Sequence, residues 1–347
     1  MKKISFFVLH TYVKDAQSAI HYLQLQHLNQ SFEFNWNSET PDYLIATEQI
    51  YTDQKLFKEF FKLANKAKVL IFFSREAQSP DFNIFDYAVG FDSQLSNYDR
   101  FVQLPTAFDL YPAFLTVCEN SIKSKEEASI ELNKKNRFCN FLYSNPKAHP
   151  LRDQLFFKLS EYKKVDSLGR HLNNTTQKGT GYMGHESDCV LIKNPYKFSI
   201  ASENACFGGY TSEKILTSLA AHTVPIYFGD PFIEDIINPR CFINVNKYKE
   251  LDDVLARVQE IDNNDELWYE MVSEPWQTPE QVKTSEKRLS NYLKFFENIF
   301  SQDPLIAVRR PLGCRPDIYK EFVKNAHIQQ KPAILLKMYK YYRRWFS

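Results

Sequence analysis

One stretch of the sequence, residues 198–229, constrains the fold of the chain more than any other. It opens with an apolar run at 198–201, passes through a loop that contains Gly208 and Gly209, starts a helix, and ends in a second apolar run at 224–228. This order of strand, glycine loop, helix start and strand predicts a βαβ unit of a parallel sheet. The same geometry brings backbone N–H groups and the positive end of a helix against an anion.

The helix start in this stretch carries an unexpected cation. Thr211 and Ser212 are good N-cap residues, and Glu213 and Lys214 follow in the first turn. A lysine at this position opposes the helix dipole unless a negative group lies in front of it. The residues alone leave two interpretations open: an ordinary βαβ unit with Glu213 and Lys214 as a solvated pair, or a helix start that binds a phosphate.

Strand-like and helix-like segments alternate along the whole chain. The runs that predict strands are 4–9, 43–46, 69–73, 87–91, 138–143 and 241–245, and those that predict helices are 15–28, 53–66, a segment from about 149, 251–261 and 285–300. Continuous apolar strands between amphipathic helices indicate parallel sheets that are covered on both faces. Because 347 residues exceed the usual size of one core, we expect two α/β domains.

Composition excludes some classes of function. Hydrophobic residues make up 44% of the chain and charged residues 24%, as in an ordinary globular protein, and the net charge of +1 gives no signal of nucleic-acid binding. The six cysteines are scattered without metal-ligand spacing, which indicates apolar fillers in a reducing compartment. The sequence has no Asp-x-Asp motif and no cluster of histidines and carboxylates, so we expect no obligate metal.

Two further charged residues lie where α/β sheets place ligands. Glu76 follows the apolar run 69–73, and Arg152 lies in the first turn of the helix that begins near 149. Taken alone, Glu76 is a solvated or structural loop glutamate. Arg152 fits a surface pair with Asp153 or Glu161 as well as it fits contact with an anion.

These segments resemble the α1,3/4-fucosyltransferases. The nucleotide-sugar motif of that family is a Glu-Asn pair, a loop and Tyr-x-Thr-Glu-Lys; the corresponding residues here are Glu203, Asn204, Tyr210, Thr211, Ser212, Glu213 and Lys214. The run 222–229 continues the resemblance without a gap. Ser202 stands where the family usually has Phe, which bears on the packing behind the loop. Ser212 replaces Thr and keeps its hydroxyl.

The resemblance implies a role for each of these residues. The segment around Arg152 resembles one whose arginine contacts the nucleotide diphosphate in the family, and the segment around Glu76 resembles the one that carries the proposed catalytic base in bacterial members. Asp81 and Asp86, on the same connection, are the next candidates for the base. The implied donor-binding residues are Arg152, Glu203, Asn204, Tyr210, Ser212, Glu213 and Lys214.

The resemblance also implies an architecture and a reaction. We expect two facing Rossmann-like domains of the GT-B type with the active site in the cleft between them. The expected boundaries are an acceptor-binding domain at 1–120, a linker at 121–137, a donor-binding domain at 138–300 and a C-terminal extension at 301–347. The implied reaction is inverting transfer of L-fucose from GDP-fucose to an N-acetylglucosamine hydroxyl of a glycan such as N-acetyllactosamine. An α1,3 linkage is expected, in the synthesis of surface polysaccharide or lipopolysaccharide and of Lewis-type antigens.

The last segment, 331–347, has a composition of its own. It holds five Lys or Arg residues and no acid, and the apolar side chains of Ile334, Met338, Tyr341 and Trp345 fall on one helical face. This pattern predicts a basic amphipathic helix on anionic lipid, and therefore a cytoplasmic protein bound peripherally to the inner face of the membrane. The alternative is a helix that packs back on the first domain.

Two other functions remain compatible with the sequence. A GT-B glycosyltransferase that uses another nucleotide sugar would share every physical argument about the phosphate-binding loop. A catalytically inactive scaffold at the membrane surface would use only the basic segment 331–347.

Overall fold

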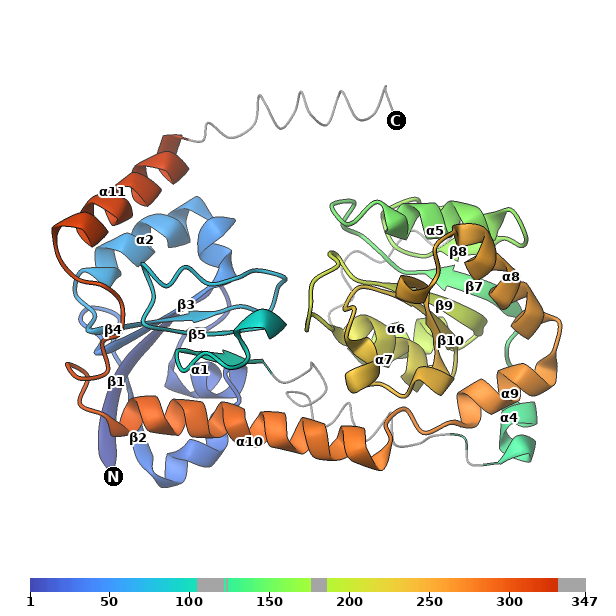
Figure 1. Cartoon of the computed structure of the whole chain (residues 1–347), viewed down its shortest axis with the longest axis horizontal. Coiled ribbons are helices and arrows are strands. Elements are labelled where there is room, and N and C mark those ends of the chain that lie inside the picture. Colours follow the sequence, from blue (N-terminus) through green and yellow to red (C-terminus); the bar gives the residue numbers. More distant parts are fainter. Residues whose placement is uncertain (105–121, 123, 176–185, 330–347) are drawn as a thin grey trace. The chain divides into compact units, whose positions relative to one another are not determined.

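Two parallel sheets organise the chain, one in each of two units (Figure 1). The computed structural model describes residues 1–104, 122, 124–175 and 186–329. Unit 1 consists of Met1–Gly90, Tyr98–Phe101 and the segment from Phe295 onward, and unit 2 consists of Phe91–Asn97 and Val102–Lys294. Helix α10 (Pro279–Ser301) begins in unit 2 and ends in unit 1.

The sheet of unit 1 has six strands. Their spatial order is β2 (Phe32–Trp36), β1 (Lys2–Leu9), β3 (Tyr43–Thr47), β4 (Val69–Phe73), β5 (Tyr87–Gly90) and β6 (Phe101–Gln103). The neighbours from β2 through β5 pair in parallel. Every residue of β3, β4 and β5 is buried, so both faces of the sheet centre are covered. The strand order changes direction between β1 and β3, which is where open sheets leave room for a ligand beyond the carboxyl ends of the strands.

The helices of unit 1 differ from the sequence prediction at one point. They are α1 (Ala16–Tyr22), α2 (Gln54–Ala64) and α11 (Cys314–Gln329), together with the 3₁₀ turns η1 (Gln26–Gln30) and η2 (Glu48–Tyr51). The helix predicted at 15–28 ends at Tyr22, because Gln24 takes a left-handed backbone with φ of 52° and its side-chain amide donates to His21 O. Helix α2 begins as predicted, with Asp53 as its N-cap.

The sheet of unit 2 has five strands, all parallel. Their spatial order is β11 (Ile243–Asn244), β10 (Val224–Phe228), β9 (Tyr196–Ser202), β7 (Arg137–Phe141) and β8 (Val165–Ser167). If the strands of unit 2 are numbered in chain order and read from β8 to β11, their order is second-first-third-fourth-fifth. The first five strands of unit 1 have the same order. The direction changes between β7 and β9, so the favoured ligand position lies beyond the carboxyl ends of these two strands.

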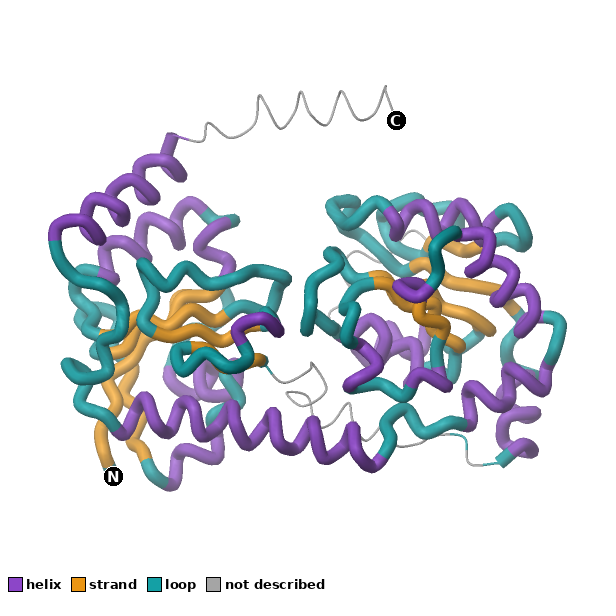
Figure 2. The backbone as a smooth tube through the Cα atoms, viewed as in Figure 1, coloured by secondary structure: helices purple, strands orange, loops and turns teal. Residues whose placement is uncertain are grey.

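Helices cover both faces of the unit 2 sheet (Figures 1 and 2). The helices of unit 2 are α4 (Lys125–Leu132), α5 (Leu151–Ser160), α6 (Glu186–Lys193), α7 (Glu213–Ala220), α8 (Leu251–Asp262) and α9 (Asp265–Ser273). Its 3₁₀ turns are η3 (Ser93–Leu95), η4 (Ile233–Asp235), η5 (Pro239–Cys241) and η6 (Val245–Lys247). One apolar cluster joins α5, α8 and α9 to the sheet, with Trp268 fully buried in it. A second cluster packs Ile215 and Leu216 of α7 against the opposite face.

The expected domain boundaries stay a prediction, and some of them fall on residues that the structure leaves undescribed. Residues 121 and 123 of the expected linker lie outside the described residues, while α4 forms within the linker's remaining part. In the expected C-terminal extension, α11 contacts α2 of unit 1. The basic segment 331–347 lies outside the described residues. Among the helices that the structure describes, none is long and apolar enough to cross a membrane.

Candidate active site

A buried carboxylate occupies the start of α7. Glu203 follows β9 directly and is 0% exposed; its two carboxylate oxygens accept from Ser212 N at 2.8 Å and Ser212 Oγ at 2.7 Å. Lys214 Nζ lies 3.2 Å from the same carboxylate and donates to Ser212 Oγ at 2.8 Å. Glu203 is therefore a negative group in front of the α7 dipole, of the kind that the position of Lys214 requires. Burial by itself lowers the pKa of Lys214, but the neighbouring carboxylates of Glu203 and Glu213 hold that pKa well above its usual value.

The glycine loop before α7 is closed by an aspartate that the sequence motifs did not indicate. Gly209 has φ of +91°, and a Cβ atom there would lie 2.2 Å from Phe91 O, so only glycine fits. Asp230, just beyond β10, accepts from Gly209 N at 2.8 Å and from Thr211 Oγ1 at 3.2 Å. One of the backbone N–H groups expected to face a ligand is thus already bonded within the protein. The only signal in the sequence was the place of Asp230, at the carboxyl end of a buried strand.

Arg152 is a buried cation that has no carboxylate partner among the residues that the structure describes. It comes from the first turn of α5, and only 1% of its surface is exposed. Its guanidinium stacks 4.1 Å above the ring of Tyr143 and donates to Ser202 O at 3.2 Å and to Asn204 Oδ1 at 2.6 Å. Its Nε is buried and finds no hydrogen-bond partner within the described part of the chain. An uncompensated buried charge is costly, so this geometry favours an anion as the missing partner.

The remaining predicted donor-binding residues lie around the same sheet edge. Asn204 bonds Arg152, and its backbone oxygen accepts from His149 N at 2.8 Å. Tyr210 is 2% exposed and its ring packs edge-on against Phe91, with centroids 5.1 Å apart. The Glu213 carboxylate lies 3.5 Å from Lys214 Nζ; burial by itself raises the pKa of Glu213, but the Lys214 cation lowers it below its usual value. The structure therefore gathers the predicted donor-binding residues at the carboxyl ends of β7 and β9, the position that the strand order favours.

A second lysine lies behind this group. Lys193, at the end of α6, is 4% exposed and donates to Thr217 Oγ1 at 2.7 Å, Ser218 Oγ at 3.0 Å and Lys214 O at 3.3 Å. Burial lowers the pKa of the Lys193 ammonium to about 8. No local pattern marks Lys193 in the sequence, because only the packing of α6 on α7 brings it here.

Replacing Lys193 by Met is expected to stabilise the protein at neutral pH. An unfolded lysine titrates near 10.5, so the unfolded chain binds more protons than the native one between pH 8 and pH 10.5. The cost of the buried charge, about 3 kcal/mol from the size of the pKa shift, is fully present below pH 8 and disappears as the pH rises to 10.5. Urea unfolding of both proteins at pH 7 and pH 10 checks this. A gap in unfolding free energy that does not shrink with pH would contradict it.

The predicted base, Glu76, lies in unit 1. It is an exposed residue on the loop after β4, and its backbone N–H donates to Ser74 Oγ at 3.2 Å. Asp86, one of the two alternative candidates, does not fit the role. It is 0% exposed, and its oxygens accept from Leu70 N, Arg309 N and Arg310 N and from the Arg310 guanidinium. Asp86 therefore cannot reach an acceptor, and this part of the sequence prediction is wrong.

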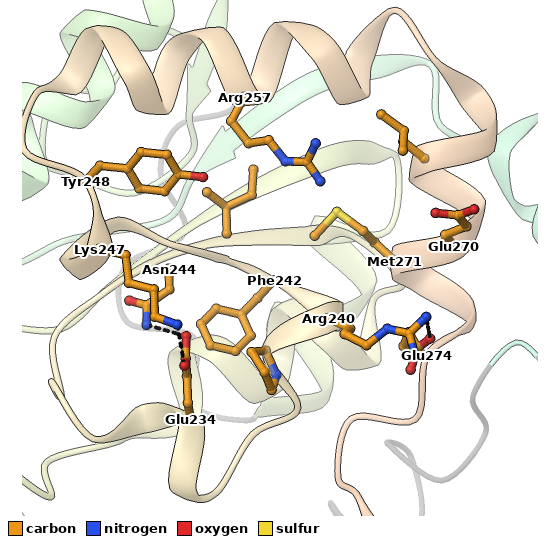
Figure 3. Close-up of a pocket in the computed structure, with 13 residues that line it drawn as sticks. Glu234, Arg240, Phe242, Asn244, Lys247, Tyr248, Arg257, Glu270, Met271 and Glu274 are labelled. Atoms are coloured by element: carbon orange, nitrogen blue, oxygen red, sulfur yellow. Dashed lines mark hydrogen bonds and ion pairs between the residues drawn. The ribbon is translucent and has the colours of Figure 1, made fainter.

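A cavity of about 500 Å³ lies elsewhere in unit 2, between η5–η6 and helices α8 and α9 (Figure 3). None of the predicted donor-binding residues lines it. Its charges are largely matched, since Arg240 pairs with Glu274 at 2.7 Å and Lys247 with Glu234 at 2.6 Å. In the part of the chain that the structure describes, no group of His, Cys, Asp and Glu side chains is placed to hold a metal ion.

Comparison of the fold with solved structures indicates a class of protein. A crystal structure of an α1,3-fucosyltransferase with GDP superposes with a TM-score of 0.66 at 23% sequence identity, over 89% of this chain and 93% of that one. A crystal structure of an α1,3-fucosyltransferase with GDP-fucose gives a TM-score of 0.66 at 22% identity, over 90% and 94% of the two chains. The fold is therefore that of the GT-B glycosyltransferases, as predicted.

Family models then give the particular family. The model for glycosyltransferase family 10 (fucosyltransferase), C-terminal part, matches residues 132–299, and the model for the alpha-(1,3)-fucosyltransferase FucT N-terminal domain matches residues 9–111. The chain belongs to glycosyltransferase family 10, the fucosyltransferases, which confirms the family predicted from the sequence motifs.

Similar curated proteins are longer than this chain. Alpha-(1,3)-fucosyltransferase FucT of Helicobacter pylori is 28% identical over 274 residues, which are 71% of this chain and 55% of that protein. GDP-fucose protein O-fucosyltransferase 3 of Xenopus laevis is 32% identical over 125 residues, or 35% and 27% of the two chains. The chain thus spans about half the length of the Helicobacter protein.

Proposed function

We propose that the protein is an inverting fucosyltransferase that moves L-fucose from GDP-fucose to an N-acetylglucosamine hydroxyl of a glycan, with α1,3 linkage. The main support for the proposal is Arg152, a buried guanidinium with no carboxylate partner in the described ranges of the chain, beside the Glu203–Lys214 pair at the start of α7. A diphosphate supplies the anion that this arrangement favours. Family membership and the name of the Helicobacter relative support fucose as the sugar.

The chemistry asks for a base and for a group that stabilises the leaving diphosphate. The acceptor oxygen attacks the anomeric carbon of fucose, its proton passes to the base, and the bond between that carbon and the diphosphate oxygen breaks. Arg152 presents a planar fork of donors to two phosphate oxygens, and Lys214 adds a point charge. Glu203 acts through Lys214 and the start of α7, because its oxygens already accept from Ser212 and Lys214.

Glu76 is the proposed base. It is exposed at the carboxyl end of β4, so it is accessible to an acceptor hydroxyl. It belongs to unit 1 and the donor-binding residues belong to unit 2, which allows the two roles to be tested by separate measurements.

Turnover of GDP-fucose with N-acetyllactosamine tests the proposed function directly. Formation of GDP together with a fucosylated product supports it, and mass spectrometry of the product gives the linkage. GDP-mannose and UDP-sugars are compared with GDP-fucose by the rise in melting temperature that each produces. A larger rise with one of them would favour a transferase for that sugar. Binding without turnover of any donor would favour the inactive scaffold.

Arg152→Ala and Lys214→Ala are each expected to lower the affinity for GDP and for GDP-fucose at least tenfold. Both ligands carry the diphosphate, and a charge-assisted contact to phosphate contributes about 1.5–3 kcal/mol. Calorimetry measures the change. Lys158→Ala is the matched control, because Lys158 lies on the same helix as Arg152 and pairs with Glu161 and Asp252 instead. Unchanged GDP affinity in both site variants would remove these residues from the donor site.

The segment 331–347 is proposed to bring the protein to an anionic membrane surface. Each of its five cations contributes about 1 kcal/mol near such a surface. Deleting the segment is expected to abolish binding to vesicles that contain phosphatidylserine and to leave turnover of a soluble acceptor largely intact. Sedimentation with vesicles and the turnover assay check the two halves of this prediction. Loss of folding on deletion would instead mean that the segment is a structural helix.

A further inference from the structure

The strand order of unit 1 places a group of polar side chains where a ligand is favoured. In unit 2 the corresponding position, beyond β7 and β9, holds Arg152 and Asn204. In unit 1 the change of direction lies between β1 and β3. His10 follows β1, and Glu48 and Gln49 follow β3. The two ends lie at one level, because Leu9 is paired with Ala46 in the parallel register.

A hydrogen-bond network fixes this edge of the sheet. Gln49 accepts from Thr11 N at 3.1 Å and from Thr11 Oγ1 at 2.9 Å, and its amide nitrogen lies 2.9 Å from His10 Nε2. The His10 ring lies 4.5 Å from the ring of Tyr22, centroid to centroid, and the Arg75 guanidinium lies 5.6 Å from the same Tyr22 ring. The loop that carries Glu76 therefore starts beside a set of side chains that contact one another, because Arg75 and His10 both lie against the ring of Tyr22.

Glu48 connects this network to the loop of the proposed base. Thr47 and Phe73 are paired in the register of β3 and β4, so the residues that follow them lie side by side. Glu48 Oε2 accepts from Arg75 N at 3.3 Å, one residue before Glu76. A second hydrogen bond lies within the same loop, because the Ser74 hydroxyl donates to Glu76 O at 3.0 Å. Glu48, the residue that follows β3, thus holds the loop after β4 in place.

We propose that Glu48 is a positioning residue for Glu76, because it holds the 74–76 backbone through Arg75 N. The proposal rests on the proposed function, in which Glu76 is the base. Burial, and then repulsion from Glu76, raise the pKa of Glu48 against the opposing effects of hydrogen bonds to backbone N–H groups and of the Arg75 charge. The charged or titratable groups around Glu48 are Arg75, Glu76 and, through its coupling to Arg75, His10.

Hydrogen exchange tests the positioning role independently of activity. Glu48→Ala removes the acceptor for Arg75 N and is expected to speed amide exchange at least tenfold in peptides that cover 74–78. Glu48→Gln keeps an oxygen acceptor and is expected to leave this exchange within threefold of the wild type. Glu59→Gln, the same change on the exposed face of α2, is the matched control. Wild-type exchange in the Glu48→Ala loop would overturn the positioning role.

Acceptor kinetics test the consequence for the proposed base. Glu48→Ala is expected to lower acceptor kcat/KM at least tenfold while GDP affinity stays unchanged. Glu48→Gln, which keeps an oxygen acceptor for Arg75 N, is expected to stay within threefold of the wild type. Wild-type kcat/KM in Glu48→Ala would overturn this part. Absence of turnover in the wild type would refute the proposed function, whereas the exchange measurement would still decide the positioning role.

Discussion

Replacing Glu76 by Gln is expected to reduce turnover of GDP-fucose roughly 10²–10⁴-fold and to leave the affinity for GDP and GDP-fucose unchanged. The size of the loss is the usual contribution of a general base that removes a proton in the transition state. Affinity for the donor should not change, because Glu76 belongs to unit 1 and the proposed donor-binding residues belong to unit 2. Gln is the stricter substitution, since it keeps the size and much of the hydrogen bonding of Glu.

The control for Glu76 lies on the same connection between β4 and β5. Asp81 is the remaining alternative base, and its carboxylate accepts from Asn83 N at 2.9 Å and from the Tyr319 hydroxyl at 2.7 Å. Asp81→Asn is expected to retain turnover within a few-fold. If Glu76→Gln retained turnover and Asp81→Asn lost it, the base would be Asp81. Single-turnover measurements separate the chemical step from product release in both variants.

The sequence predicted the strands that are apolar throughout and missed those that are short or half exposed. The runs 69–73 and 224–228 form β4 and β10 with the predicted bounds. Both strands are buried on both faces, so each appears in the sequence as one uninterrupted apolar run whose ends are easy to locate. Strand β2 was missed, since it lies at the edge of the sheet and, after the buried Phe32, its residues alternate between exposed and partly buried. The run 241–245 was predicted as one strand, but only Ile243–Asn244 form β11, because the residues on either side belong to the 3₁₀ turns η5 and η6.

The sequence predicted a set of charged residues for the donor site but not how their charges compensate one another. A cation in the first turn of α7 indicated a negative group in front of the helix, and a phosphate was the candidate. The structure places Glu203 there, nine positions before the N-cap Ser212. Asp230 and Lys193 were missed for the same reason: their roles depend on contacts between elements that no local spacing encodes. A ligand's contact with these residues remains a prediction.

The segment after α10 is attached to unit 1 by a buried ion pair, and we expect this pair to matter for stability. Asp86 Oδ1 accepts from Arg309 N at 2.7 Å and Arg310 N at 2.8 Å, and Asp86 Oδ2 accepts from Leu70 N at 2.7 Å and from the Arg310 guanidinium. Arg310 NH1 also donates to Lys68 O at 3.0 Å. One carboxylate thus joins the start of β4 to a segment more than two hundred residues away.

Asp86→Ala is expected to lower the free energy of unfolding by about 3–5 kcal/mol. The substitution leaves the Arg310 guanidinium buried without its counter-charge and leaves three backbone N–H groups without their acceptor. Asp81→Ala, which removes a more exposed carboxyl of the same connection, is expected to cost less than about 1 kcal/mol. Urea unfolding followed by circular dichroism measures both.

The double variant Asp86→Ala with Arg310→Met separates the ion pair from the backbone contacts. Removing both charges takes away the uncompensated cation, so the double variant is expected to be less destabilised than the sum of the two single variants. The loss of unfolding free energy that remains in the double variant then comes from the backbone N–H groups of Leu70, Arg309 and Arg310. These groups have lost their acceptor, and no substitution at Arg310 can replace it. GDP affinity should stay at the wild-type value at temperatures where the variants are folded, because the proposed donor-binding residues belong to unit 2. Strict additivity of the two single effects would show that the charges of Asp86 and Arg310 do not stabilise one another.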